Sequence, residues 1–208
     1  MEVVIFLAKI KNCEKKLGSN RLSITLDNKN KFISPEEVSA SWKDNYTEKV
    51  SRNKDEVGLR VPQFGALSAI RAHWTTSMAP ATIVLPTGTG KSETIFSTIV
   101  SERITSSLII VPSNYLREQL YEGAKNFGIL PKLEMISANA LFPTTLMYKS
   151  KPKKEDEDLL LEYILNSNII VTTPRMLSSM SPKIMKQLVQ KVDVVFFDEA
   201  HHLAAKEW

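Results

Sequence analysis

The sequence predicts an α/β domain with a mostly parallel sheet, preceded by a small N-terminal accessory segment. The main observation is that short, β-branched apolar stretches alternate with longer helical stretches after about residue 58. A second is that the preceding residues are rich in lysine and asparagine and lack this alternation. The composition, 208 residues with 43% hydrophobic and 24% charged, is that of an ordinary globular chain and excludes collagen-like, disordered and small disulfide-rich proteins.

The predicted strands are nearly continuous apolar runs, which suit a parallel sheet covered on both faces. They span residues 81–85, 107–111, 168–172 and 192–197. The helices predicted around and between them span residues 63–78, 91–104, 114–127, 155–165 and 182–190. Strands that alternate with helices in this way are typically joined by right-handed crossovers.

The accessory segment is predicted to cover residues 1–58 and the main domain residues 59–208. Residues 22–26 alternate between apolar and polar side chains, which indicates a strand. Residues 44–55 contain few apolar side chains and have no clear period, so a loop or a frayed helix is expected there.

Charge and cysteine content exclude little and name no partner. The formal net charge of +4 is too small to prove that the chain binds nucleic acid. Cys13 is the single cysteine, so no disulfide can form within the chain and a reduced, cytoplasmic setting is expected. The first residues do not resemble a signal peptide, and no stretch has the length of a membrane span, so no membrane partner is expected.

The strongest motif is Pro-Thr-Gly-Thr-Gly-Lys-Ser at residues 86–92, between a predicted strand and a predicted helix. Gly88 and Gly90 allow positive φ angles, so that backbone N–H groups and the helix N-terminus converge on phosphates. Lys91 would supply a positive charge at the β- and γ-phosphates, and the Ser92 hydroxyl would reach Mg²⁺. The motif therefore predicts an ATP–Mg²⁺ site.

Two adjacent carboxylates follow the last predicted strand, at Asp198 and Glu199. The carboxyl edge of a parallel sheet is where α/β proteins place their ligands. Asp198 is expected to hold Mg²⁺, and Glu199 to orient and deprotonate the water that attacks ATP.

These motifs resemble those of superfamily 2 helicases and translocases. The loop departs from the strict phosphate-binding pattern at Leu85, where a glycine would stand, but its Pro-Thr-Gly-x-Gly-Lys form resembles motif I of that superfamily. Asp-Glu-Ala-His at residues 198–201 resembles motif II of DEAH-type helicases, and the second histidine that follows is similar to a variant in restriction and DNA-translocase subunits. The resemblance implies a RecA-like fold for residues 59–208, with His201 coupling the ATP site to a second motor domain.

A weaker element, Leu-Arg-Val-Pro-Gln at residues 59–63, resembles the segment that precedes motif I in many of these motors. There the glutamine reads adenine, and the Gln63 amide offers the matching donor and acceptor. The predicted nucleotide-binding residues are Arg60, Gln63, Thr87, Gly88, Thr89, Gly90, Lys91, Ser92 and Glu93.

Two further junctions resemble motifs Ia and Ib, at residues 112–119 and 172–176. In this superfamily they grip the phosphates of one nucleic-acid strand, and Ser113, Thr173 and Arg175 have suitable hydroxyl and guanidinium groups. Ser113 and Thr173 are equally suitable as helix caps, and both roles are compatible.

The sequence thus predicts the first motor domain of an ATP-dependent helicase or translocase. The second histidine of motif II favours a bacterial restriction or antiviral-defence system, with DNA favoured over RNA. Complete members carry a second RecA-like domain that this chain lacks, so we expect the chain alone to hydrolyse ATP poorly.

Other functions stay open or are disfavoured. The alternative is a nucleotide-binding scaffold that docks a partner protein, through residues 1–58, and does not translocate. A phosphate-loop kinase is disfavoured by Leu85 and by the adjacent acids. A zinc site at His201 and His202 lacks companion ligands, because His73 and Cys13 are the only other histidine and cysteine.

Overall fold

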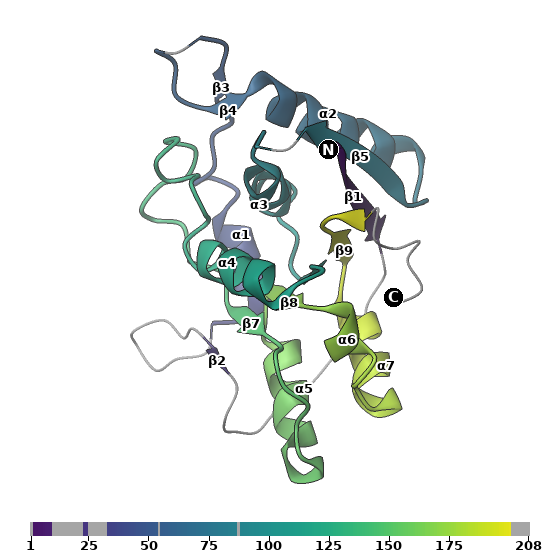
Figure 1. Cartoon of the computed structure of the whole chain (residues 1–208). Coiled ribbons are helices and arrows are strands. Elements are labelled where there is room, and N and C mark those ends of the chain that lie inside the picture. Colours follow the sequence, from purple (N-terminus) through teal and green to yellow (C-terminus); the bar gives the residue numbers. More distant parts are fainter. Residues whose placement is uncertain (1, 10–22, 25–32, 54, 87, 201–208) are drawn as a thin grey trace.

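A computed structural model describes residues 2–9, 23–24, 33–53, 55–86 and 88–200, with the backbone alone for 2–9 and 23–24. Its main sheet has seven strands in the order β2-β7-β8-β6-β9-β1-β5 (Figure 1). These strands are β1 (Glu2–Lys9), β2 (Ser23–Ile24), β5 (Ala81–Pro86), β6 (Ser107–Ile110), β7 (Thr145–Met147), β8 (Ile169–Thr172) and β9 (Val194–Phe197). A separate two-stranded sheet pairs β3 (Val50–Ser51) with β4 (Leu59–Arg60).

The helices lie between the strands along the chain, as the alternating pattern predicts. They are α1 (Pro35–Ser41), α2 (Val61–Thr76), α3 (Lys91–Ser101), α4 (Asn114–Ala124), the short 3-10 helix η1 (Lys154–Asp156), α5 (Glu157–Leu165), α6 (Pro174–Leu177) and α7 (Pro182–Lys191). Neighbouring pairs among β7, β8, β6 and β9 are parallel. The prediction of an α/β fold with a mostly parallel sheet is confirmed.

Two hydrophobic clusters cover the two faces of the central strands, because alternate residues of a strand point to opposite faces. On β6, Ile109 belongs to the cluster that packs with α1, α2, α3 and α4. Its neighbours Leu108 and Ile110 belong to the cluster that packs with α5 and α7. The molecule therefore has three layers, with the sheet between two sets of helices.

The strand β5 differs from the prediction of a sheet covered on both faces. Leu85 is buried, but Val84 on the opposite face is 48% exposed, and Thr82 and Pro86 are also exposed. α2 contacts β5 on the covered side, whereas the residues that build the second cluster come from α5, α7 and the strands β6 to β9. An apolar run alone does not tell a strand covered on both faces from one covered on a single face.

β1 lies inside the main sheet, between the strands that carry the two strongest motifs. It pairs antiparallel with β5 on one side and antiparallel with β9 on the other. Figure 1 shows this N-terminal strand alongside the end of β9. β5 and β9 consequently point in the same direction while β1 separates them.

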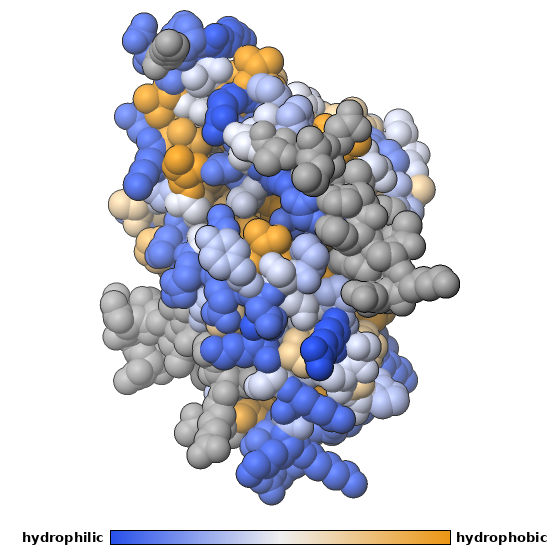
Figure 2. Space-filling model, viewed as in Figure 1, coloured by the Kyte–Doolittle hydropathy of each residue, from blue (hydrophilic) through white to orange (hydrophobic). Residues whose placement is uncertain are grey.

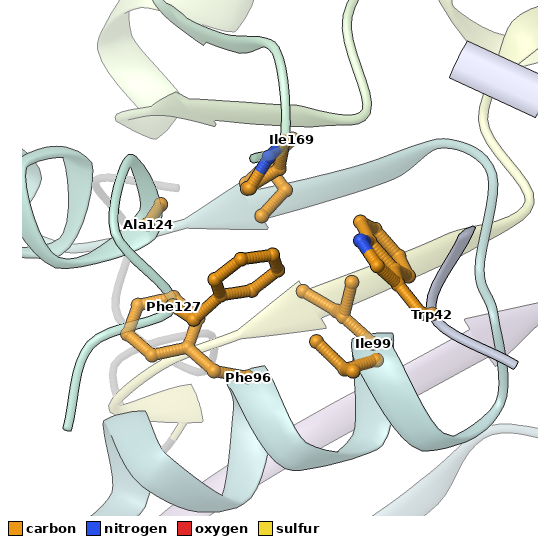
Figure 3. A pocket seen from close by; sticks show the side chains of 8 residues that line it. Trp42, Phe96, Ile99, Ala124, Phe127 and Ile169 are labelled. Atoms are coloured by element: carbon orange, nitrogen blue, oxygen red, sulfur yellow. The ribbon is translucent and has the colours of Figure 1, made fainter. Parts of the chain in front are cut away.

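Part of the predicted accessory segment packs into the main core. The Trp42 side chain, which follows α1, is 1% exposed and donates from Nε1 to the Leu141 carbonyl at 2.9 Å. Figure 3 shows the indole facing Ile99 and the aromatic rings of Phe96 and Phe127, around a small apolar gap with no room for a water molecule. The boundary near residue 58 stays a prediction, but residues 35–42 contribute directly to the stability of the sheet domain.

The polar tract that follows Trp42 is mostly a loop, held by ion pairs, but it also contains β3, which the expectation of a loop or a frayed helix missed. Arg71 on α2 contacts Glu48 in the loop and Glu102 after α3, at 2.6 and 2.7 Å. Tyr46 sits beside this group, and burial raises the pKa of its hydroxyl above the ordinary value. The loop is thereby tied to both α2 and α3.

Three helices, α2, α3 and α4, end before the predicted boundary, and α2 ends at Thr76. Arg103 and Phe127 have φ angles of 50° and 59°, in the left-handed region that stops a helix. α3 therefore ends at Ser101 and α4 at Ala124. Both stops are set by backbone geometry that the apolar pattern does not record.

The lower end of the molecule in Figure 2, over α5 and α7, is mostly hydrophilic. Lys183 of α7 pairs there with Asp158 of α5. None of the helices in the described ranges combines the length and apolar character that a membrane span would need.

Candidate nucleotide and nucleic-acid sites

Residues 88–90, just before α3, form a tight glycine turn. Gly88 and Gly90 have φ angles of 79° and 84°, as expected for a loop whose N–H groups turn inward. Both the backbone N–H and the hydroxyl of Thr89 donate to the Pro86 carbonyl, at 3.2 and 2.6 Å. Thr87, the remaining residue of the predicted loop, lies outside the described residues.

The turn leads straight into α3, whose N-cap is Gly90 and has no side-chain cap. The first N–H groups of a helix lack partners inside the helix, and a glycine cap leaves them available to an anion. Lys91, Ser92 and Glu93 form the first turn and are half-buried. This is the geometry that the phosphate-binding motif predicts.

The start of α2 braces the glycine turn. An Arg60 guanidinium N–H donates to the Gly88 carbonyl at 3.0 Å, and Gln63 Nε2 donates to the Gly90 carbonyl at 3.1 Å. Gln63 Oε1 accepts from the Arg60 backbone N–H at 2.7 Å, and the side chain is 2% exposed. Sequence reasoning missed this bracing role, because Arg60 and Gln63 lie 28 and 27 residues before the glycines that they contact.

Adenine recognition by Gln63 stays a prediction. A primary amide has two donor hydrogens and two acceptor lone pairs, and the two contacts above use one of each. A nucleotide base would therefore have to bind with the remaining donor and acceptor while Gln63 keeps hold of the turn.

The two glycines of the turn should respond very differently to alanine. A Cβ at Gly90 would lie 2.0 Å from Gln63 Nε2, whereas a Cβ at Gly88 would have no atom within 4 Å. Both substitutions carry a backbone cost of about 1 kcal/mol at positive φ. We expect Gly90→Ala to weaken binding of a fluorescent ATP analogue at least tenfold more than Gly88→Ala. Equal losses in the two variants would contradict the bracing role of Gln63.

The predicted acids come to the same place from the other end of the chain. The Asp198 N–H donates to the Ile110 carbonyl at 2.9 Å, which continues the pairing of β9 with β6. Lys91 Nζ lies 2.6 Å from Glu199 Oε1 and 3.9 Å from Asp198 Oδ1. Glu199 has a φ of 57°, a left-handed conformation that non-glycine residues adopt rarely.

The residues around Lys91 fit a nucleotide with a divalent cation. Mg²⁺ is usually held by one or two carboxylates together with phosphates and water, and the Ser92 hydroxyl and Asp198 supply oxygen ligands of that kind. Within the described ranges, no three His, Cys, Asp or Glu side chains gather into a metal site made by the protein alone. His201, predicted to couple the site to a second domain, lies outside the described residues.

A separate cavity of about 560 Å³ lies at the carboxyl ends of β6 and β8. Its walls are Pro112, Ser113, Asn114, Thr173, Pro174, Arg175 and Ser178. Ile110 of β6 lies opposite Thr172 of β8, so the residues that follow the two strands meet at this edge. The structure thus brings Ser113, Thr173 and Arg175 to one cavity, and their contact with nucleic acid stays a prediction.

The capping role of the two hydroxyl residues holds for one of them. The Ser113 hydroxyl accepts from the Leu116 N–H at 3.2 Å and caps α4. Thr173 is the N-cap residue of α6, but its side chain makes no capping hydrogen bond. Arg175, the second residue of α6, has an exposed side chain.

The fold and the two sites define a RecA-like P-loop domain of the superfamily 2 helicase type. A family model described as type III restriction enzyme, res subunit, matches residues 56–208. This match covers more than half of the chain, so the chain belongs to that family. The family supports an ATP-dependent, helicase-like motor domain of restriction-type systems. Searches of curated proteins and of solved structures found no match.

Proposed function

We propose that this chain binds and hydrolyses ATP–Mg²⁺ and uses it to move along DNA as part of a restriction or antiviral-defence system. The observation that carries the proposal is the contact between Lys91, at the glycine turn, and Glu199, more than a hundred residues away. A phosphate-binding lysine and a carboxylate at one sheet edge are the two halves of an ATP-hydrolysing site.

In this proposal each side chain has a definite task. Lys91 contacts the β- and γ-phosphates, Ser92 and Asp198 hold Mg²⁺, and Glu199 orients the attacking water. Bound Mg²⁺ would neutralise charge on the phosphate oxygens. Arg60 and Gln63 fix the turn, and Gln63 also reads adenine.

The nucleic-acid contact lies one strand away from the acids. β6 is the immediate neighbour of β9 in the sheet, and Asp198 pairs with Ile110 of β6. Three residues further along β6 and its loop, Ser113 lines the cavity with Thr173 and Arg175. A strand bound in the cavity would therefore lie next to the site of hydrolysis, which suits a motor that couples the two.

Arg175→Ala tests the nucleic-acid part of the proposal. Each phosphate neutralised by a cation contributes about 0.7 to the slope of log affinity against log salt for a single strand and about 0.9 for a duplex. We expect the variant to weaken binding of fluorescein-labelled DNA for every sequence tested and to reduce this slope by about one phosphate. Fluorescence anisotropy at several salt concentrations measures both quantities.

Lys132→Ala is the matched control, because it removes one exposed positive charge from the loop that follows α4, beyond the opposite end of that helix. Its salt slope should equal that of the parent chain. If the chain binds no nucleic acid, or if both variants change the salt slope equally, nucleic acid does not bind in this cavity. Capture of a partner protein would then favour the scaffold alternative.

A further inference from the structure

Tyr115 is an exposed aromatic residue that the ATP site does not use. It is the second residue of α4, and its side chain is 77% exposed. No other residue in the described ranges makes a hydrogen bond, ion pair or ring contact with it. By contrast Tyr121, on the same helix, is 5% exposed and belongs to the core.

The position of Tyr115 connects it to the cavity at β6 and β8. Its neighbour Asn114 lines that cavity, and consecutive Cα atoms are about 3.8 Å apart. The cavity walls combine polar and apolar surface, and the lining residues include one cation, Arg175. A strand whose phosphates enter the cavity would therefore carry its sugars and bases past the start of α4.

The charges around Tyr115 permit a nucleic acid there. Glu118, one turn further along α4, contacts the buried Arg117 at 3.3 Å, which offsets its negative charge. Glu122, another turn along, pairs with Lys125. The ring of Tyr115 is thus a neutral, accessible surface beside a cationic cavity, the combination that single-strand binding proteins use.

We infer that Tyr115 stacks on an unpaired base of the strand whose phosphates occupy the cavity, so that the ligand is a single-stranded nucleic acid. This inference rests on the proposed function. Within a duplex the faces of a base are already covered by neighbouring base pairs, so a side chain reaches a base face only where the base is unstacked. Stacking depends little on base identity, which suits a motor that must pass along any sequence.

The test compares Tyr115→Ala with Tyr115→Phe, using labelled oligothymidylate, an abasic strand with the same number of phosphates, and a hairpin duplex. We expect Tyr115→Ala to weaken binding of oligothymidylate about 5- to 150-fold and leave the salt slope unchanged. Tyr115→Phe keeps the ring and should bind like the parent chain. The parent chain should bind the abasic strand as weakly as Tyr115→Ala binds oligothymidylate.

The outcomes separate this inference from the proposed function. Base stacking is wrong if Tyr115→Ala binds oligothymidylate like the parent chain while Arg175→Ala binds it more weakly, or if the parent chain binds the abasic strand as tightly as oligothymidylate. In either case the proposed nucleic-acid site at the cavity would stand. If the parent chain binds none of the probes, both are wrong. Thermal melts provide the folding control, since replacing a side chain this exposed should leave the melting temperature almost unchanged.

Discussion

Replacing Lys91 with alanine is expected to weaken ATP–Mg²⁺ binding about 100-fold, whereas Glu199→Gln should preserve it or tighten it a few-fold. Lys91 Nζ lies 2.6 Å from Glu199 Oε1, so the carboxylate and a phosphate would compete for one ammonium group. Glutamine removes that competitor and keeps the size of the side chain. Alanine at position 91 removes the ammonium itself, and hydrogen bonds to charged groups are worth about 1.5–3 kcal/mol.

The two variants should diverge again in hydrolysis. Glu199→Gln cannot accept a proton from water, so any ATP turnover by the chain should disappear although binding persists. Titration with a fluorescent ATP analogue measures the first effect and phosphate release the second.

Lys183→Ala supplies the control for these two variants. It also removes a lysine that pairs with a carboxylate, but both side chains of that pair, Lys183 and Asp158, are largely exposed and lie away from the site. Its nucleotide affinity should match that of the parent chain. Equal nucleotide affinity in Lys91→Ala and in the parent chain would show that the phosphates do not bind at this turn.

Asn168→Asp is expected to lower the free energy of unfolding by about 3 kcal/mol or more at neutral pH. The Asn168 side chain lies at the start of β8 and is completely buried. Its Nδ2 donates to the carbonyls of Pro35 and Thr105 at 2.8 and 2.9 Å, while Oδ1 accepts from the Thr144 N–H at 3.1 Å. A carboxylate would turn a second oxygen toward two carbonyl oxygens and would also be charged without a cationic partner.

Thermal or urea unfolding would measure this loss, which corresponds to roughly 6–12 °C in melting temperature for a chain of this size. Burial should raise the pKa of the introduced carboxyl in the folded state above its value of about 3.9 in the unfolded chain. The ionisation part of the deficit is therefore fully present above the folded-state pKa, shrinks as pH falls from there towards about 3.9, and is lost below about 3.9. Asn139→Asp adds the same charge at an exposed position and should change little. If the two variants were equally stable, the hydrogen bond between Asn168 and Pro35 would not help to hold the accessory segment on the sheet.

Sequence reasoning located the glycine turn and the strand–helix alternation because both depend on residues close together in the chain. Gly88 and Gly90 adopt positive φ within a seven-residue motif, and the helix that follows needs no distant partner to begin. The same reasoning did not find β7, which spans Thr145–Met147 and is too short to show a pattern. It also placed the ends of α3 and α4 too late, because Arg103 and Phe127 adopt left-handed conformations that their residue types do not favour.

The sequence by itself determined the class of fold, the glycine turn and the types of residue that lie around it. Tertiary structure alone decided that β1 lies antiparallel between β5 and β9, that Lys91 meets Glu199, and that Gln63 braces Gly90. It also decided that Trp42, from the predicted accessory segment, packs into the core of the sheet domain. The physical reason is that φ preferences and apolar periodicity are local, whereas strand order and side-chain contacts depend on which distant segments bury their apolar surfaces together.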